Sequence, residues 1–318
     1  MKDTTGSAVV RTRRLPGATS AALHRLDLAD GSRLVLRRYA WRAYVAAEPE
    51  APRRETDALR FARRHGLAVP ELVAADVTGD HVGDGVPVVL VTFLSGRPEA
   101  VPDLERLAEV AASIHEIRAD DLGHEYFPWY EEELTTPPPL TERRGLWELA
   151  IELWRSAVPE YRPTFIHRDF HPGNLLWSRT RLTGIVDWSA ACRGPIGCDL
   201  AHCRANLRDL ADAPTGDRFV AAYTAVTGEA LDPFWVMAGH LEHDHDHWTH
   251  GRLNLDEPDL ERAVRAITDK QIGVAPNIPD RRLDDRRPRR PAGPARRSRA
   301  RPIARYAPAS PPRQRAPE

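Results

Sequence analysis

The segment from Phe165 to Trp177 carries a histidine, an aspartate and an asparagine in the order H-x-D-x-x-x-x-N. Another aspartate, Asp187, follows a short apolar run downstream. An aspartate in a loop can orient a hydroxyl group and accept its proton. The amide oxygen of an asparagine and a second carboxylate are hard ligands of the kind that Mg²⁺ prefers. These residues predict phosphoryl transfer, with Asp169 as the catalytic group and Asn174 and Asp187 as the metal ligands.

The residues around this motif are suited to holding it in place. Pro172-Gly173 permits a tight loop that turns Asn174 inward. Two short apolar runs, Leu175–Trp177 and Gly184–Val186, are expected to pair as a hairpin with Asp187 at its end. The hairpin would bring Asp187 next to Asn174 at one magnesium site.

Composition excludes several other kinds of protein. The 318-residue chain contains lysine only at Lys2 and Lys270, and neither follows a glycine-rich loop. A P-loop therefore cannot be present, and a Schiff-base lysine enzyme is not expected. The chain has no apolar run long enough to span a membrane, and Met1–Leu15 lacks the features of a secretory signal. We expect a cytoplasmic protein whose three cysteines, Cys192, Cys198 and Cys203, are reduced.

Periodicity predicts a small β-rich part followed by a larger helical part. Strands are expected at Ala22–Leu28, Arg33–Tyr39 and Val86–Phe93, and a helix from Pro52 to the His65-Gly66 stop. The later periodicity is mostly helical, over residues 104–117, 144–157, 199–211, 218–227, 233–249 and 260–268. We expect a nucleotide-binding lobe over residues 1–95 and a catalytic and substrate lobe over residues 96–275.

The remaining segment, residues 276–318, repeats arginine, proline and alanine and is expected to be disordered. Residues 280–318 hold thirteen arginines and four acidic groups, a net charge of +9. Because the whole chain carries −1, residues 1–279 carry −10. Apart from weak contact by this basic tail, we expect no nucleic acid partner.

The two motifs together resemble the catalytic and metal-binding loops of protein kinases. They are closer to those of aminoglycoside phosphotransferases and choline-kinase-like enzymes, since Asp187 is followed by Trp188-Ser189. The run Gly194-Pro195-Ile196-Gly197-Cys198-Asp199-Leu200-Ala201 is similar to a run of that branch, in which the aspartate buttresses the catalytic loop. The resemblance covers about residues 10–270. It implies an α+β, bilobal protein-kinase-like fold that binds ATP or GTP with Mg²⁺ between its lobes.

The same resemblance suggests how the small lobe binds nucleotide. Val35 would cover the adenine and Arg37 would reach the phosphates, with Arg38 as the rival if the strand register differs. Glu55 resembles the glutamate that pairs with that cation. Leu15–Ser20 stands where a nucleotide-covering loop belongs, and the segment Thr92, Phe93 and Leu94 resembles the hinge whose backbone binds the adenine edge. Arginine in place of the commoner lysine, and Arg168 in place of glycine, are departures from the family pattern.

The acceptor is predicted to be a hydroxyl group on a small molecule. Acidic residues are dense at Glu131–Glu133 and Glu242–Asp246, so we hypothesise an aminoglycoside or another cationic compound. A catalytically silent scaffold is one alternative, although no metal or base residue is missing. A protein kinase is the other, although no A-P-E-like segment follows Asp187. The histidines between His240 and His250 are expected to be a solvated helix or substrate rim, with a metal site as the alternative.

Overall fold

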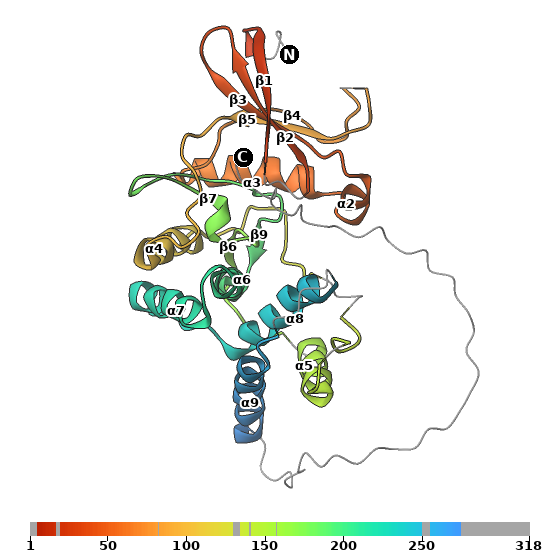
Figure 1. Ribbon diagram of the computed structural model, residues 1–318, viewed down its shortest axis with the longest axis vertical. Helices are drawn as coiled ribbons and strands as arrows, with labels where there is room; N and C mark the ends of the chain where they lie inside the picture. Colours follow the sequence, from red (N-terminus) through yellow and green to blue (C-terminus); the bar gives the residue numbers. More distant parts are fainter. Residues whose placement is uncertain are drawn as a thin grey trace, which may run out of the picture.

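A computed structural model describes residues 5–16, 20–81, 83–129, 134–139, 141–156, 158–249 and 255–274. Its first part is one antiparallel sheet in the order β1-β2-β3-β5-β4. The strands are β1 (Val9–Leu15), β2 (Ala22–Leu28), β3 (Arg33–Arg38), β4 (Leu72–Asp76) and β5 (Val88–Thr92). Figure 1 shows this sheet at one end of the molecule, with the helical part beneath it.

The two faces of the sheet carry different side chains. Leu26, Leu34 and Leu90 are buried together on one face, in a small apolar cluster. Arg37 lies on the opposite face because side chains alternate along β3, and its neighbour across the sheet is Val89, which is fully buried. Arg37 itself is only 5% exposed, which is unusual for an arginine on a surface strand.

The helix α3 (Ala51–Arg64) packs on the inner face of the sheet, where it contacts β4 and β5. The short α2 (Arg42–Ala47) leads into α3, which has a proline in its first turn and two arginines in its last. Proline suits the first turn, where its missing N–H is not needed, and the arginines complement the helix dipole. The chain then turns at Gly66, whose φ of 82° favours glycine. Ala58, Leu59 and Ala62 of α3 are buried against the core.

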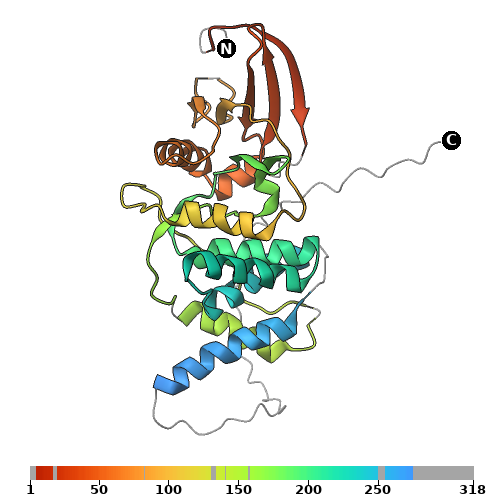
Figure 2. The ribbon, with the colours of Figure 1, turned by 90° about the vertical axis from the view of Figure 1, so that its left-hand side faces the viewer.

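The second part is mainly helical and contains α4 (Leu104–His115), α5 (Arg144–Ser156), α6 (Ile196–Leu210), α7 (Ala213–Thr227), α8 (Pro233–Thr249) and α9 (Glu257–Val274). Figure 2 shows these helices stacked below the sheet, with α9 at the far end. One apolar core continues from α3 into α4, α6 and α7, and a second joins α5, α8 and α9. No helix in the described ranges is long and apolar enough to cross a membrane.

Two small antiparallel sheets of two strands each lie where the two parts meet. β6 (Thr164–Ile166) pairs with β9 (Cys192–Gly194), and β7 (Leu175–Ser178) pairs with β8 (Arg181–Ile185). A single 3₁₀ turn over Pro172–Asn174, labelled η1, precedes β7. The segment after β5 also pairs with β7, through two backbone hydrogen bonds of 3.0 and 2.9 Å between Arg97 and Trp177. The predicted catalytic and metal-binding segments therefore lie at this junction.

The predicted fold class, a β-sheet lobe followed by a helical lobe, is confirmed. The helix bounds at α3 and α8 agree closely with the sequence analysis, whereas α6, α7 and α9 begin three to five residues earlier than expected. β1, β4 and α2 were not predicted. Residues 17–19 of the proposed nucleotide-covering loop lie outside the described residues, as does the arginine-rich segment 276–318.

Candidate active site

The backbone of the catalytic loop is held by one buried carboxylate on α6. Asp199 is fully buried, and it accepts the backbone N–H of His167 at 2.8 Å and that of Arg168 at 2.6 Å. His115 of α4 adds a third contact of 3.1 Å from its Nε2. Arg168 has a φ of 68°, in the left-handed region that non-glycine residues rarely adopt. These hydrogen bonds fix the strained turn that leads into Asp169, in the buttressing role that the family resemblance implies for Asp199.

Both carboxylate oxygens of Asp169 have partners. Asn174 donates from Nδ2 to Asp169 Oδ2 at 3.1 Å and to the Asp169 carbonyl at 2.9 Å. The Nε2 of His202, on α6, lies 3.0 Å from Asp169 Oδ1, while the Nε2 of His171 lies 3.8 Å away. Burial opposes ionisation of Asp169, but the charge of His171 and the hydrogen bond from His202 hold its pKa below the usual value. Such a carboxylate is a weak base, better suited to orienting a hydroxyl than to removing its proton early.

The two predicted metal ligands lie next to each other across the β7–β8 hairpin. The N–H of Val186, which precedes Asp187, donates to the carbonyl of Asn174 at 2.9 Å. Asp187 has a φ of 65°, and its side chain is 27% exposed. Because Nδ2 of Asn174 donates to Asp169, the amide oxygen Oδ1 points away from that bond. An amide oxygen and a partly exposed carboxylate are hard donors, so this pair fits Mg²⁺.

Arg37 connects the small lobe to the segment that is predicted to bind metal. Its Nη1 lies 3.2 Å from Glu55 Oε1 on α3 and 2.6 Å from Asp187 Oδ1, and its Nη2 donates to Ser20 Oγ at 2.8 Å. Burial alone would lower the pKa of Arg37, but the charges of Asp187 and Glu55 raise it well above its ordinary value. The Tyr39 hydroxyl donates to the other oxygen of Glu55 at 2.6 Å. A permanent cation is thus fixed beside Asp187.

Arg38, the rival to Arg37, is on the other face of β3. It pairs with Asp84 at the surface. Val35, two residues before Arg37, is half-buried on the same face as Arg37 and pairs with Val91 of β5. This register places the side chain predicted to cover the adenine beside the one predicted to reach the phosphates.

The predicted hinge follows directly from β5. The backbone N–H of Thr92 donates to the Glu71 carbonyl at 2.9 Å, and that of Phe93 donates to the Arg33 carbonyl at 3.0 Å. An adenine edge bound here would therefore use carbonyl groups of the segment or the backbone of Leu94. A Cβ added to Gly184 would lie 2.1 Å from Leu94 Cδ1, so Gly184 lets the hinge approach β8 closely.

Two acidic groups of α8, Glu242 and Asp244, are neutralised by arginines, while the side chain of Asp246 lies outside the described residues. Glu242 pairs with the fully buried Arg168 at 2.9 Å, and the Arg168 guanidinium lies 3.9 Å from the ring centre of Trp129. Asp244 pairs with Arg208 of α6 at 2.9 Å. These two carboxylates therefore add no unbalanced charge toward an acceptor. The other predicted acidic run, Glu131–Glu133, lies outside the described residues.

Sequence reasoning did not identify two residues that contact the site, Tyr39 and His202, and it placed Ser20 in the nucleotide-covering loop without its contact to Arg37. Tyr39 follows Arg37 by two positions and His202 follows Asp199 by three, so strand and helix spacing could have found both. Ser20 has no such signal, because its contact with Arg37 depends on how the chain crosses from β1 to β2.

The other candidate metal ligands do not assemble. The described residues contain no group of three or more histidine, cysteine, aspartate or glutamate side chains that could hold a metal ion. Cys192, Cys198 and Cys203 are buried free thiols, and burial raises the pKa of Cys192 to about 12. His243 contacts Asp209 at 2.9 Å, while the side chain of His247 lies outside the described residues. This arrangement agrees with the expectation that the three cysteines are reduced.

The chain matches the phosphotransferase enzyme family (APH) over residues 11–234, more than two thirds of its length, and it belongs to that family. It is 30% identical over 158 residues to a homoserine kinase of Beijerinckia indica, covering 44% of this chain and 48% of the relative. It is 27% identical over 168 residues to an aminoglycoside 3'-phosphotransferase of Streptomyces fradiae, covering 45% and 63%. The match thus spans about half the length of the first relative and less than two thirds of the second.

Solved structures of the family share the fold. An aminoglycoside-3'-phosphotransferase of type VIII superposes with a TM-score of 0.54 at 20% identity, covering 73% of this chain and 93% of that one. A macrolide 2'-phosphotransferase from Brachybacterium faecium gives 0.54 at 18% identity, covering 88% and 98%. A thermostable mutant of the aminoglycoside phosphotransferase APH(4)-Ia, in ternary complex with AMP-PNP and hygromycin B, gives 0.56 at 17% identity, covering 84% and 95%. These likenesses establish the protein-kinase-like fold.

Proposed function

We propose that the protein is a small-molecule kinase that transfers the terminal phosphoryl group of ATP or GTP to a hydroxyl group. The observation that carries the proposal is the chain of contacts from Glu55 through Arg37 to Asp187, next to Asn174 and Asp169. A cation, two metal-type oxygen ligands and a fixed carboxylate are the parts that phosphoryl transfer requires. Family membership and the nucleotide analogue in the APH(4)-Ia complex support the same activity.

The residues divide the reaction between them. Asp169 accepts a hydrogen bond from the acceptor hydroxyl and takes its proton as the oxygen bonds to the γ-phosphorus. The bond from that phosphorus to the bridging oxygen breaks, and the electron pair leaves with the nucleoside diphosphate. Arg37 would face the phosphates, and its positive charge would offset theirs. Val35 and Thr92–Leu94 would hold the base.

Asn174 and Asp187 would hold Mg²⁺. Mg²⁺ commonly binds one or two protein carboxylates and completes its octahedron with phosphate oxygens and water, so two protein ligands suffice. An ion held by these two residues would supply positive charge that offsets the charge of the phosphates. The chain supplies the rest: Ser189 Oγ donates to Asp187 Oδ1 at 3.1 Å and helps to fix that carboxylate.

The two alternatives are less well supported. A silent scaffold is expected to have lost the base, a metal ligand or the phosphate cation, whereas all of these residues are present and in contact. A protein kinase is disfavoured because Asp187 is followed by Trp188, which is fully buried and stacks on Phe165. A protein kinase would carry a phenylalanine at that position, in its D-F-G motif.

The decisive experiment measures nucleotide consumption by the purified protein with Mg·ATP and Mg·GTP across a panel of hydroxyl compounds. L-homoserine, hygromycin B and a macrolide belong in the panel because they represent the acceptors that the relatives suggest. We expect one nucleotide to be consumed with at least one acceptor, and activity to be lost in excess chelator. No consumption with any acceptor under these conditions would refute the proposal.

The matched control is Asp169→Asn, which keeps the size of the side chain and removes its charge. A positioned base contributes roughly 10²–10⁴-fold to the rate. We expect kcat to fall by that amount while the affinity for Mg·ATP, measured by calorimetry, stays within about twofold. Unchanged turnover in this variant would remove Asp169 from the mechanism, even if the protein is a kinase.

A further inference from the structure

A histidine on α6 contacts the catalytic carboxylate directly. The Nε2 of His202 lies 3.0 Å from Asp169 Oδ1, and the His202 side chain is 18% exposed. Asn206 Nδ2 lies 3.2 Å from the same Nε2 and donates to the His202 carbonyl at 2.9 Å. Because an ionised carboxylate can only accept, the contact with Asp169 requires the proton of His202 to be on Nε2. The histidine of the loop itself, His171, stays 3.8 Å from the same oxygen, which is beyond hydrogen-bond range. His202 is therefore the imidazole that bonds to the base, although it lies outside the H-x-D-x-x-x-x-N motif.

The position of His202 on α6 explains why it can reach Asp169. Asp199 and His202 are three residues apart, so they project from neighbouring positions on one face of the helix. Asp199 binds the backbone of the loop at His167 and Arg168, and His202 binds the side chain one residue further along. One helix thus sets both the path of the catalytic loop and the orientation of its carboxylate.

The neighbours of His202 restrict the motion of its ring. Trp129 packs edge-on against it with ring centres 5.6 Å apart, and His171 and His243 lie at 5.8 and 6.2 Å. Trp129 is itself fixed, because its backbone N–H donates to Glu242 at 2.9 Å. An imidazole held on three sides can impose one orientation on Asp169.

We propose that His202 is a positioning residue for phosphoryl transfer: its Nε2–H fixes the rotamer of Asp169 and so directs the free lone pairs of the carboxylate toward the acceptor hydroxyl. Asn174 holds Oδ2 and His202 holds Oδ1, so rotation of the carboxylate about its own axis breaks two hydrogen bonds. The predicted effect on the rate rests on the proposed kinase activity. The statement that His202 fixes the rotamer of Asp169 does not.

The test compares His202→Ala with His202→Gln, whose amide N–H can replace the donor. The matched control is His124→Ala, since His124 pairs with Asp57 at the same distance of 3.0 Å and is 14% exposed. Turnover is measured with Mg·ATP and either water, L-homoserine or hygromycin B as acceptor. Small misplacement of a reacting group can cost about 10²-fold. We expect kcat in His202→Ala to fall by about 10- to 100-fold, with KM for ATP within about twofold.

The conservative variant and the control separate positioning from folding. His202→Gln should recover kcat to within about threefold of the parent, because one donor replaces another. His124→Ala should leave kcat unchanged even if it lowers the melting temperature. A parental kcat in His202→Ala, or a loss that His202→Gln does not recover, would overturn the inference.

A second readout does not depend on activity. Crystal structures of the parent, His202→Gln and His202→Ala should show Asp169 in one rotamer in the first two and in more than one in the third. A single unchanged rotamer in His202→Ala would also overturn the inference. If the parent phosphorylates no acceptor, the proposed function fails, and the rotamer comparison still decides whether His202 positions Asp169.

Discussion

At the scale of single residues, Asp187 combines an observed ion pair with the position proposed for a metal ligand. It already pairs with Arg37 at 2.6 Å, and its position beside Asn174 is suited to holding a metal ion. We expect Asp187→Ala to weaken magnesium-dependent binding of ATP by at least about tenfold, a typical loss when a metal site is damaged. Calorimetric titrations with and without Mg²⁺ measure this. The control is Asp84→Ala, which removes a surface partner of Arg38.

The same magnesium dependence in Asp187→Ala and in the parent would show that the metal ligands are wrongly assigned. If Asp187→Ala loses the same amount of ATP affinity with and without Mg²⁺, the loss would instead come from the ion pair with Arg37.

The adjacent arginines of β3 allow a direct comparison of two faces of one strand. Arg37 is buried between Glu55 and Asp187, whereas Arg38 pairs with an exposed carboxylate. We expect Arg37→Ala to raise KM for ATP far more than Arg38→Ala, since exposed pairs contribute only about 0–1 kcal/mol. Arg37→Lys, which keeps the positive charge, should fall between Arg37→Ala and the parent.

Removing Arg37 also leaves Glu55 buried without its cation, which typically costs about 3–5 kcal/mol. Steady-state kinetics must therefore be measured at a temperature where thermal melting shows each variant to be folded. If Arg38→Ala raised KM for ATP more than Arg37→Ala, the face of β3 that carries Arg38 would be the one that faces the phosphates.

At the scale of elements, the sequence predicts best where a periodic apolar pattern sets the structure. The α3 and α8 bounds follow from such patterns and from Pro52, Gly66 and Pro233. β1 has no apolar alternation, because it is an edge strand rich in arginine and most of its residues are exposed. Charged edge strands resist aggregation, but a prediction based on hydrophobic patterns takes them for loops.

In the candidate site, too, local sequence predicts some features and tertiary packing determines the others. The spacing of Asp169, Asn174 and Asp187 follows from chemistry that is local in sequence, so it could be predicted. The pairing of Arg168 with Glu242 could not be predicted, because the chain passes through α6 and α7 before α8 returns to the loop. Helix spacing from Asp199 could have placed His202 near the loop, but its contact with Asp169 depends on how α6 packs. Long-range pairs of this kind depend on tertiary packing, which single-sequence patterns do not encode.

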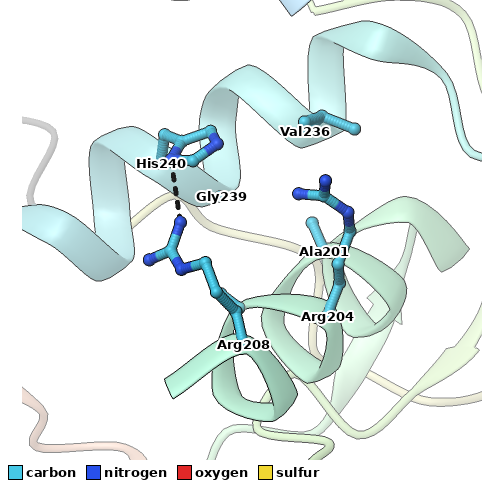
Figure 3. A pocket seen from close by; sticks show the side chains of 7 residues that line it. Ala201, Arg204, Arg208, Val236, Gly239 and His240 are labelled. Carbon is cyan, nitrogen blue, oxygen red and sulfur yellow. Dashed lines mark hydrogen bonds between the residues drawn. The ribbon is translucent and has the colours of Figure 1, made fainter. Parts of the chain in front are cut away.

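The packing of α6, α8 and α9 depends on a buried histidine. His240 lies between Asp244, 3.1 Å from its Nδ1, and Asp259, 2.8 Å from its Nε2. Arg208 of α6 lies 3.3 Å from Nδ1, and Figure 3 shows this contact between α6 and α8. Burial lowers the pKa of His240, but the hydrogen bonds to the two carboxylates outweigh it and raise the pKa above its ordinary value of 6.5. The charge of Arg208 opposes that rise.

A raised histidine pKa stabilises the fold fully below the pKa of the unfolded chain, and that contribution is lost as pH rises through the folded pKa. We expect the unfolding free energy of the parent to exceed that of His240→Gln by about 1–3 kcal/mol at pH 6 and by less at pH 9. Denaturant titrations at the two pH values measure the difference. A gap that is equal or larger at pH 9 would show that His240 is neutral in the fold.

At the scale of the whole molecule, the site is assembled by contacts that cross between the two lobes. Arg54 of α3 donates to the Ser189 carbonyl at 3.0 Å, next to the ion pair of Arg37 with Asp187. The N–H of Ile185 donates to the Ala68 carbonyl at 2.8 Å. The segments proposed to bind nucleotide and metal are therefore fixed relative to each other by contacts of α3, Ala68 and β8.

The charge of the whole chain bears on the acceptor. Residues 1–279 carry −10 and residues 280–318 carry +9, although Glu242 and Asp244 are already neutralised by arginines. A net negative body attracts a cationic acceptor over about 10 Å at 0.1 M salt, and more weakly as salt increases. We expect deletion of residues 276–318 to keep activity, because the family match ends at residue 234 and the described helices end at residue 274.

In the truncated protein, kcat/KM for a polycationic acceptor such as hygromycin B should fall several-fold between low salt and 0.3 M salt, while that for L-homoserine, which carries no net charge, should stay constant. The comparison is informative because both acceptors share the same base, nucleotide and metal ligands, so a difference in salt dependence comes from the field around the site. Activity confined to neutral or anionic acceptors and insensitive to salt would contradict a cationic substrate. Loss of all activity on truncation would instead assign the basic segment to the site.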